Sequence, residues 1–335
     1  IMLVVCGSAT SWILSNLSRN RGGLYGRLTC EIKLSPFNLK ECEDYFKNEN
    51  IEMSRYDIVQ SYMVFGGIPY YLSYFKKGMS FEGNADNILF GKNPRLKDEF
   101  NRLFNAIFSN PEDCKKIIRL LAKKHVGFTR EEIAKETGLP FGGGLTDTLN
   151  ALVESDFIQR YRPYNVSGKV SFYKLIDNFS LFWLKYVEPN TEDINFMTDN
   201  MTSNIMRVWR GVAFEEVCWQ HIGQIKRALG ISGVSSSISA WSVKGNDNKE
   251  GVQIDLLIIR NDNVVNLCEM KFAGDIYSID KEEDAKIRNR IQTLINTLSP
   301  KQSVHLTMIT TYGVSHTMYG GRVQQQVILD DLFQS

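Results

Sequence analysis

Two neighbouring apolar segments in the last third of the chain carry charged residues where paired β-strands would bring them together. Asp255 stands within the apolar segment 251–260, and Glu269 and Lys271 end the segment 263–272. Alternation along a strand directs Glu269 and Lys271 to the same face. When the two strands pair, the three side chains converge. The sequence therefore predicts a site for a divalent cation and a phosphate group.

The chemistry of these side chains supports that prediction. Asp255 and Glu269 are the predicted metal ligands, because Mg²⁺ takes hard oxygen ligands and activates a bound water. Lys271 adds positive charge beside the phosphate. A further carboxylate from the preceding helix completes the expected catalytic set. We expect Glu216 in this role rather than Glu215, since neighbouring helical residues point about 100° apart and only one faces the sheet.

The pattern is short, and its surroundings give it weight. A helix is predicted over 205–229, followed by strands at 234–241, 251–260 and 263–272, a helix at 280–298, a strand at 303–310 and a closing pair. This is the order of an α/β domain. Gln253 precedes the aspartate on the same strand, where we expect it to bind water or phosphate. The charged run 281–284 predicts a solvated helix start.

Composition limits the classes of function. The 335 residues carry a net charge of +1, and segment 201–335 holds as many basic as acidic residues, so any phosphate-binding surface is local. Six scattered cysteines without a C-x-x-C pair predict reduced, buried thiols rather than a zinc or disulfide framework. No apolar run is long enough for a membrane helix. We therefore expect a cytoplasmic protein with no membrane partner.

The first third of the chain predicts an α/β segment followed by helices. Residues 1–8 form a continuous apolar run typical of a central parallel strand. Such a strand needs neighbours, and we therefore expect that the natural start lies upstream. A basic, glycine-rich loop and a strand at 29–34 follow. Helices are predicted at 38–47, 54–66, 97–109 and 111–124.

The middle of the chain has the element order of a winged helix. Thr129 and Glu132 form a capping box that opens a helix ending at Gly138. A second helix at 145–158 and a hairpin at 159–177 follow. The second helix is acidic, which favours a packing or protein-contact role. The hairpin is basic and leaves DNA contact open, with four candidate residues: Arg160, Arg162, Lys169 and Lys174. The four histidines lack ligand spacing, so we expect structural or solvated roles for His125, His221, His305 and His316.

Together these segments resemble a known family of prokaryotic AAA+/STAND-type ATPases, of the kind found in archaea and Bacteroides-like bacteria. LVVCGSATSWI and GRLTCEIKLSPF resemble the late part of the ATPase module, and FGGIPYYL resembles its helical lid. TREEIAKETG with GGGLTDTLNALVESDFI resembles the winged-helix segment. GVQIDLLIIR with LCEMK resembles a C-terminal PD-(D/E)XK nuclease-like domain, a restriction-endonuclease-like α/β fold.

The resemblance implies a multidomain α/β protein. Residues 1–110 would be a remnant of the AAA+ module with its helical lid, 111–188 the winged-helix domain and 201–335 the nuclease-like domain. Ser8 matches the position that senses the γ-phosphate. Arg27 matches an arginine finger, with Arg21 as the alternative. The nuclease triad falls on the three residues that the strand pattern already indicated.

The family's phosphate-binding loop and acidic strand, Walker A and Walker B, would precede Ile1 and are absent. We therefore expect a truncated ATPase-family chain that neither binds nor hydrolyses ATP. Its expected function is Mg²⁺-dependent DNA cleavage or processing by the C-terminal domain. The alternative is a non-catalytic module that keeps the nuclease-like fold and binds DNA or protein. The expected partners are DNA, other proteins or a second copy of the chain.

Overall fold

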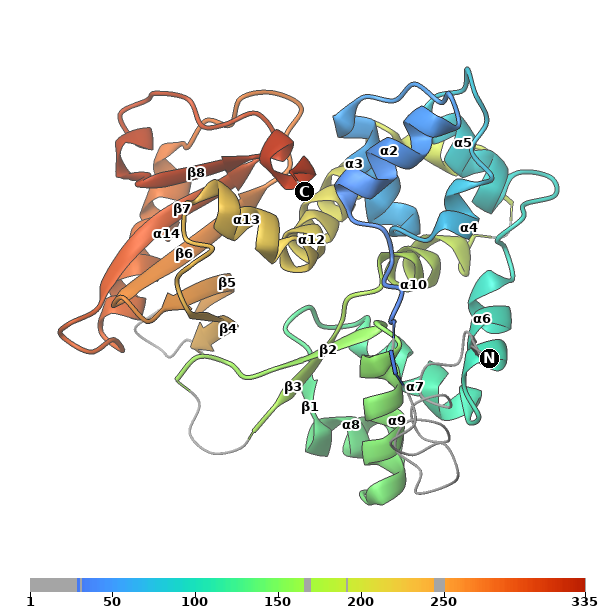
Figure 1. Cartoon of the computed structure of the whole chain (residues 1–335), viewed down its shortest axis with the longest axis horizontal. Coiled ribbons are helices and arrows are strands. Elements are labelled where there is room, and N and C mark those ends of the chain that lie inside the picture. The colour runs from blue at the N-terminus through green and yellow to red at the C-terminus, as the bar shows by residue number, and fades with distance from the viewer. Residues whose placement is uncertain (1–28, 31, 166–169, 191, 244–250, 335) are drawn as a thin grey trace. The chain divides into compact units, whose positions relative to one another are not determined.

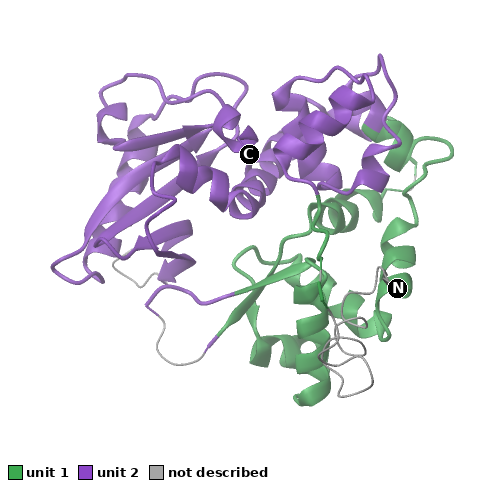
Figure 2. Ribbon diagram, in the orientation of Figure 1, with its two compact units in different colours: residues 1–36, 85–160, 171–195 green, residues 37–84, 161–170, 196–335 purple. Residues whose placement is uncertain are grey.

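The computed structural model describes residues 29–30, 32–165, 170–190, 192–243 and 251–334. Ser8, Arg21, Arg27 and Lys169 lie outside these residues, and the expectations for them stay predictions. The chain divides into two units (Figure 2). Unit 1 is built from the described parts of 1–36, 85–160 and 171–195, and unit 2 from those of 37–84, 161–170 and 196–335. The three-segment division drawn from the resemblance stays a prediction.

Unit 1 combines helices with a small sheet. Its helical elements are η2 (Asp86–Phe90), α6 (Glu99–Ile107), α7 (Pro111–Leu121), α8 (Arg130–Thr137), α9 (Gly143–Glu154), α10 (Asn178–Phe182) and η3 (Trp183–Val187). Its strands are β1 (Phe128–Thr129), β2 (Ile158–Tyr161, whose last residue is assigned to unit 2) and β3 (Phe172–Leu175), in the order β1-β3-β2. The predicted capping box is confirmed, because the Thr129 side chain and the Glu132 side chain each accept a hydrogen bond from the other residue's backbone N–H.

Aromatic packing holds the helices of unit 1 together. The rings of Phe100 and Trp183 stack with centroids 4.7 Å apart, and Phe104 lies 4.9 Å from Phe157. The indole Nε1–H of Trp183 donates to the carbonyl of Lys97 at 2.8 Å. The polar end of this buried ring is therefore satisfied as well as its apolar body, which fixes α10–η3 against α6.

Two predictions in unit 1 need correction. Residues 32–34 do not form the predicted strand. The second helix of the winged-helix pattern occupies Gly143–Glu154 rather than 145–158, because Asp156 takes a positive φ of 59° and turns the chain into β2. An aspartate tolerates this left-handed backbone better than most residues, which is why the helix ends there.

Unit 2 begins with helices. They are α2 (Leu39–Asn48), α3 (Arg55–Phe65), α4 (Pro69–Leu72), α5 (Phe81–Ala85, whose last residue is assigned to unit 1), α11 (Phe196–Asn200), α12 (Asn204–Gln220) and α13 (Ile222–Ala228). The predicted helices 38–47 and 54–66 are confirmed as α2 and α3. Asn38 caps α2, and Gly66 ends α3 with a φ of 63°, a conformation that favours glycine. The predicted helix 205–229 is interrupted at His221, which separates α12 from α13.

The larger sheet of unit 2 has five strands (Figure 1). They are β4 (Ser236–Val243), β5 (Val252–Arg260), β6 (Val264–Lys271), β7 (Ser303–Thr310) and β8 (Gln325–Ile328), hydrogen-bonded in that order. The pairs β4–β5 and β5–β6 are antiparallel, and β6–β7 and β7–β8 are parallel. Helix α14 (Lys281–Ile295) connects β6 to its parallel neighbour β7. Two short 3-10 helices complete the unit, η4 (Gly320–Arg322) and η5 (Leu329–Phe333).

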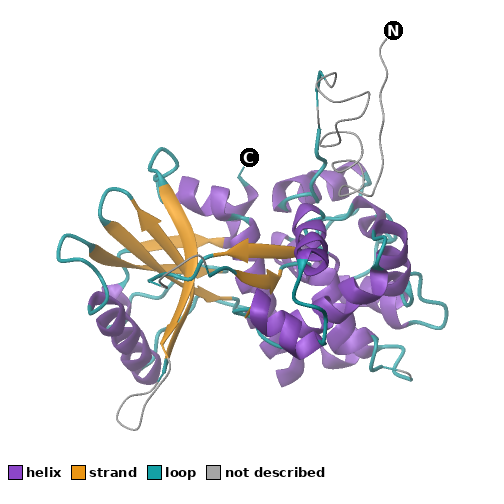
Figure 3. Cartoon of the chain, turned by 90° about the horizontal axis from the view of Figure 1, so that it is seen from below, coloured by secondary structure: helices purple, strands orange, loops and turns teal. Residues whose placement is uncertain are grey.

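Helix α14 covers one face of this sheet. Ile287 and Leu294 of α14 pack with Leu257, Leu267 and Leu306 in one buried cluster. On the opposite face, the Phe214 ring of α12 lies 5.4 Å from that of Phe272, the residue after β6. The sheet is therefore buried on both sides, which explains its near-continuous apolar strands. Figure 3 distinguishes the strands from the helices around them.

Four cysteines are buried as free thiols, as predicted: Cys42, Cys114, Cys218 and Cys268. Cys30 is exposed, and Cys6 lies outside the described residues. Among the helices that the structure describes, none is both long and apolar enough to cross a membrane.

The buried His221 joins the beginning of α2 to the end of α12. Its Nε2 accepts the backbone N–H of Leu39 at 3.0 Å, and its Nδ1 lies 2.8 Å from the carbonyl of Val217. The imidazole is therefore neutral, with its proton on Nδ1 donated to Val217. Burial lowers the pKa of His221 to about 4, against a weaker opposing effect of the hydrogen bond to Val217. The structural role predicted for this histidine is confirmed.

We predict that acid weakens the fold through His221. Below pH 6.5 the unfolded chain binds a proton at this imidazole, whereas the folded chain binds one only below about pH 4. The contribution of His221 is thus complete above pH 6.5 and declines on acidification, by about 2 kcal/mol at pH 5. Urea unfolding of wild type and His221→Asn at pH 7.5 and pH 5 measures it. The decrease in the free energy of unfolding between pH 7.5 and pH 5 should be smaller in His221→Asn than in wild type. The exposed control His316→Asn should show the same decrease as wild type.

Candidate active site

The antiparallel pairing of β5 and β6 brings Asp255 and Glu269 together. Leu256 pairs with Cys268, and Asp255 and Glu269 come next on their strands. The β5 strand is also bulged at this point, because Leu257 lies opposite Ser239 and Ile254 opposite Trp241. Two residues of β5, Asp255 and Leu256, therefore face a single residue of β4. Bulges often re-aim a side chain at the edge of a functional site.

Glu269 is the most buried member of the predicted set. Its exposed fraction is 8%, and Arg290 of α14 donates from one guanidinium nitrogen to both carboxylate oxygens, at 2.9 and 2.8 Å. Burial raises the pKa of Glu269 above its usual value, and the nearby Asp255 adds to the rise, while Arg290 and Lys271 lower it. Asp255, Glu269 and Lys271 thus interact, as the strand pattern predicts.

Lys271 is held by acidic and aromatic neighbours. Its ammonium forms an ion pair with Glu283 of α14 at 2.6 Å and lies 5.9 Å from the centre of the Tyr277 ring. The Tyr277 hydroxyl donates to the same Glu283 carboxylate. Gln253 donates its amide N–H to the Asp255 carboxylate at 2.6 Å. The amide is therefore a positioning partner of Asp255, and the prediction that it binds water or phosphate stays untested.

Glu216 is the inward-facing member of the glutamate pair. It is 1% exposed and lies between the fully buried Phe214 and Val217, whereas Glu215 is half-buried. Both Glu216 and Asp255 raise the pKa of the buried Tyr161, after the larger effect of burial itself. The Trp219 indole N–H donates to the carbonyl of Asp255 at 2.9 Å. Helix α12 thus brings Glu216 to the neighbourhood of Asp255.

Arg290 and Glu283 were not expected from the sequence. The run 281–284 begins α14 with Lys281 and Glu282 exposed, as predicted, whereas Glu283 and Asp284 are not solvated. The Glu283 side chain is 16% exposed, and Asp284 is buried against Arg322 at 2.7 Å and Arg288 at 3.0 Å. A periodic signal was present. Positions 283, 287, 290 and 294 share one helical face with a spacing of three to four residues. Two charged residues interleaved with Ile and Leu on that face indicate buried partners for a charged strand.

The donor set suits a magnesium ion bound mainly through one or two carboxylates. Among the described residues, no group of three or more His, Cys, Asp or Glu side chains is arranged to hold a metal, so Glu216 does not complete a three-carboxylate cage. Mg²⁺ is commonly held by one or two carboxylates together with waters and substrate phosphates. Asp255 and Glu269 fit this donor set, because a carboxylate has about four lone-pair positions and hydrogen bonds leave some of them available.

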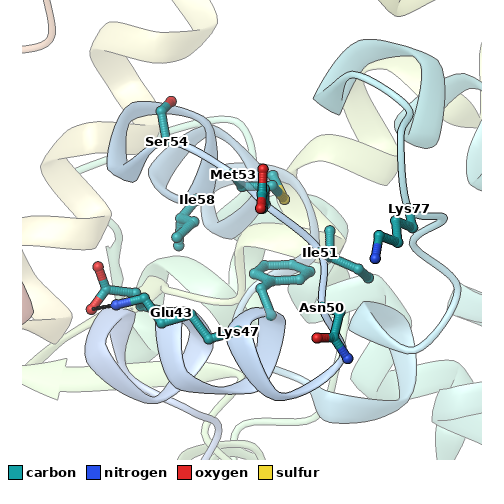
Figure 4. Close-up of a pocket in the computed structure, with 10 residues that line it drawn as sticks. Glu43, Lys47, Asn50, Ile51, Met53, Ser54, Ile58 and Lys77 are labelled. Carbon is teal, nitrogen blue, oxygen red and sulfur yellow. Dashed lines mark ion pairs between the residues drawn. The ribbon is translucent and has the colours of Figure 1, made fainter.

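A pocket in the helical part of unit 2 is a separate feature. It has a volume of about 510 Å³ and lies between α2, α3 and the loop that joins them, with Lys77 on one side (Figure 4). Its polar lining includes Glu43, which forms ion pairs with Lys47 at 3.1 Å and Arg55 at 2.9 Å. Asp255, Glu269 and Lys271 do not line this pocket. The strand-borne site is therefore not part of it.

The candidate DNA contacts of the hairpin differ in exposure. Arg160 and Arg162 are exposed, and Arg160 donates to the Ser171 hydroxyl at 3.2 Å. Lys174 is only 5% exposed. The expectation of a phosphate contact at Lys174 is therefore corrected, because β3 turns this side chain inward. A buried ammonium cannot reach the backbone of a nucleic acid on the surface.

Comparison with known proteins gives distant relatives. No protein-family profile matches the chain. An uncharacterized protein of Methanocaldococcus jannaschii, MJECL04, is 27% identical over 266 residues, which cover 78% of this chain. The chain spans 57% of the length of that relative.

Three solved structures show weak likeness. The Walker-type ATPase PABY2304 of Pyrococcus abyssi gives a TM-score of 0.36 at 18% identity, over 53% of this chain and 51% of that protein. The protein VC1899 of Vibrio cholerae gives 0.24 at 12% identity, over 72% and 55%. The restriction endonuclease FokI gives 0.24 at 10% identity, over 68% and 44%. At these TM-scores the alignments define no shared fold.

We predict that Arg290 stabilises the fold by neutralising Glu269. Replacing Arg290 by Leu leaves a buried carboxylate without its cation, which should cost on the order of 3 kcal/mol in the free energy of unfolding at pH 7. The double variant Arg290→Leu/Glu269→Gln should recover most of the loss, because no uncompensated charge remains. Urea unfolding measures both.

The control for this experiment is Arg288→Leu on the same helix. Its side chain is 54% exposed and its partner Asp284 keeps Arg322. The expected loss is therefore below about 1 kcal/mol. Equal losses in Arg290→Leu and in the double variant would contradict a role in charge neutralisation.

Proposed function

We propose that the α/β part of unit 2 hydrolyses phosphodiester bonds in DNA with the help of Mg²⁺. The observation that carries this proposal is the convergence of Asp255 on β5 with Glu269 and Lys271 on the paired strand β6. Two acids and an ammonium close together are the minimum set for cation-assisted phosphate chemistry. The resemblance of GVQIDLLIIR and LCEMK to PD-(D/E)XK nucleases supports the same class of reaction.

The proposed roles follow from the contacts. Asp255 and Glu269 would hold the cation, which when bound polarises the phosphate and lowers the pKa of a coordinated water. Gln253 orients Asp255, and Glu283 with Tyr277 orients Lys271. The ammonium of Lys271 supplies positive charge to the phosphate oxygens. Arg290 keeps the buried Glu269 compensated and contributes a second positive group at the site.

The raised pKa of Glu269 links this chemistry to pH. A carboxyl group that retains its proton to a higher pH must lose it before it can bind a cation. Cation affinity at the site is thus expected to rise with pH as this carboxyl ionises.

The ion pairs of the candidate site favour a second possible function, binding without catalysis. Glu269 with Arg290 and Lys271 with Glu283 form ion pairs that compensate the site internally. Such pairing suits a non-catalytic module that keeps a nuclease-like fold and binds DNA or protein. The exposed Arg160 and Arg162 would then be phosphate contacts of a winged-helix hairpin. Cation binding and cleavage separate the two functions.

We predict that DNA cleavage depends on Glu269 and Lys271. The assay uses Mg²⁺ or Mn²⁺ with supercoiled, linear and single-stranded DNA. Glu269→Gln and Lys271→Met should each lower the rate by about 100-fold or more, because one removes a charged ligand and the other removes positive charge at the phosphate. Gel assays of product formation with time measure the rate.

The matched control is Glu282→Gln, an exposed glutamate in the first turn of α14. It should cleave as fast as wild type. Cleavage that survives in both Glu269→Gln and Lys271→Met would reveal a contaminating nuclease and reject the proposal. Absence of cleavage by wild type, together with no Mn²⁺ binding by calorimetry, would favour the non-catalytic function.

A further inference from the structure

Three aromatic side chains form a stack at the end of the strands that carry the site. The ring of Tyr56, on α3, lies 4.7 Å from that of Phe272 at an angle of 24°. It also lies 6.3 Å from the ring of Tyr312, and these two rings are almost parallel at 8°. Phe272 rests in turn on the buried Phe214 of α12. We call the three residues Tyr56, Phe272 and Tyr312 the aromatic stack.

The aromatic stack lies at the same strand ends as the candidate active site, on the opposite face of the sheet. Phe272 directly follows Lys271, and alternation turns these neighbours to opposite faces of the sheet. Lys271 pairs with Thr310 of β7, and Tyr312 is two residues further along. The carboxyl ends of the parallel strands β6 and β7 therefore carry both groups. Ligands of open α/β sheets bind outside these strand ends.

Tyr312 is the exposed end of the aromatic stack. It retains 47% of its accessible surface, whereas Tyr56 and Phe272 are half-buried. An isolated exposed tyrosine is ordinary in a soluble protein. Here the exposed Tyr312 ring lies against the parallel Tyr56 ring. Tyr56 in turn stacks on Phe272, which packs on the buried core. Tyr312 is therefore a solvent-accessible ring on a packed aromatic support.

The backbone around Tyr312 is fixed by hydrogen bonds on both sides. The N–H of Gly313 donates to the Thr310 hydroxyl at 2.9 Å, and the carbonyl of Thr311 accepts from Leu329 at 3.2 Å. The carbonyl of Gly313 accepts from Tyr277 at 2.9 Å. Gly313 has a φ of 91°, which favours glycine. The backbone that carries the ring is therefore ordered before a ligand arrives, and this lowers the entropy lost on binding.

Positive charge borders the aromatic stack. The guanidinium of Arg210 lies close enough to Tyr56 to act on its hydroxyl, and Arg210 is oriented by a 2.8 Å hydrogen bond to Gln60. Lys271 precedes Phe272 on β6 and projects from the other face of the sheet, toward Glu283. An exposed aromatic ring near a guanidinium matches a nucleobase whose neighbouring phosphate reaches that cation. A paired base cannot offer its face, because both faces are stacked within the duplex.

We propose that Tyr312 stacks an unpaired nucleobase of single-stranded DNA next to the phosphate at the candidate active site. This inference rests on the proposed function and names its substrate class, a single-stranded or frayed end rather than intact duplex. Tyr56 and Phe272 support the ring, and Arg210 contacts the adjoining backbone.

The test measures binding without cleavage. Fluorescence anisotropy in EDTA compares a single-stranded oligonucleotide, its duplex and an abasic strand of the same length. Tyr312→Ala should weaken single-strand binding roughly 5- to 100-fold, whereas Tyr312→Phe, which keeps the ring, should bind like wild type. Wild type should bind the abasic strand more weakly than the intact strand by a similar factor. Tyr312→Ala should bind the abasic strand and the intact strand equally, because the substitution and the missing base each remove one partner of the same stack. The salt dependence should be unchanged, since no charge is removed.

The matched control is Tyr70→Ala, a tyrosine of the same unit that is 55% exposed and packs on Tyr74. It should leave binding unchanged. Equal weakening of duplex and single strand in Tyr312→Ala, additive losses with the abasic strand, or no affinity for single strands would overturn the inference. Unchanged DNA affinity in Tyr312→Ala would also overturn the inference and would favour a protein as the partner of this surface.

Failure of this inference is distinguishable from failure of the proposed function. Ring-dependent binding without metal-dependent cleavage would reject hydrolysis and keep the stacking surface. Cleavage that requires Glu269 but is indifferent to Tyr312→Ala on single strands would reject the stacking surface and keep hydrolysis.

Discussion

The antiparallel pairing of β5 with β6 is the constraint on which the rest of unit 2 depends. It sets Leu256 opposite Cys268, which brings Asp255 beside Glu269 and turns Glu269 and Lys271 toward α14. A slip of one residue would move the whole charged set to the other face. The same strands present their apolar residues to α14 on one side and to α12 on the other. Register thus couples the stability of the core to the geometry of the site.

Burying a carboxylate in this sheet carries a desolvation cost, and a cation on helix α14 compensates for it. Glu269 is desolvated, and Arg290 offsets that cost with hydrogen bonds to both oxygens. Lys271 and Glu283 make a second pair about two turns of α14 nearer its start. The charged residues of β6 are therefore matched by charged residues on the facing helix. An enzyme that binds a cation and phosphate and a module that binds only a partner would both begin from this compensated arrangement.

Much of the fold follows from local patterns. The capping boxes at Asn38 and Thr129 and the glycine after Phe65 act within a few residues, so helix ends there are predictable. The strands β4 to β7 are evident from apolar runs of the right length. The break at His221 was not predictable in the same way, because the imidazole acts through the backbone of Leu39, far away in the sequence. The same holds for the inward turn of Lys174.

The sequence by itself determined which residues are candidates for the proposed chemistry. Asp255, Glu269 and Lys271 lie at strand positions whose alternation fixes a common face, and the helical angle between Glu215 and Glu216 singles out the inward one. Only the tertiary structure decided which groups neutralise them and what stands beside them. Arg290 and Glu283 reach the site from the later helix α14. The aromatic stack at the strand ends joins Tyr312, after β7, with Tyr56 of α3, over two hundred residues earlier in the chain. Local periodicity specifies the direction of a side chain within its element, whereas contacts between elements depend on packing that no short segment encodes.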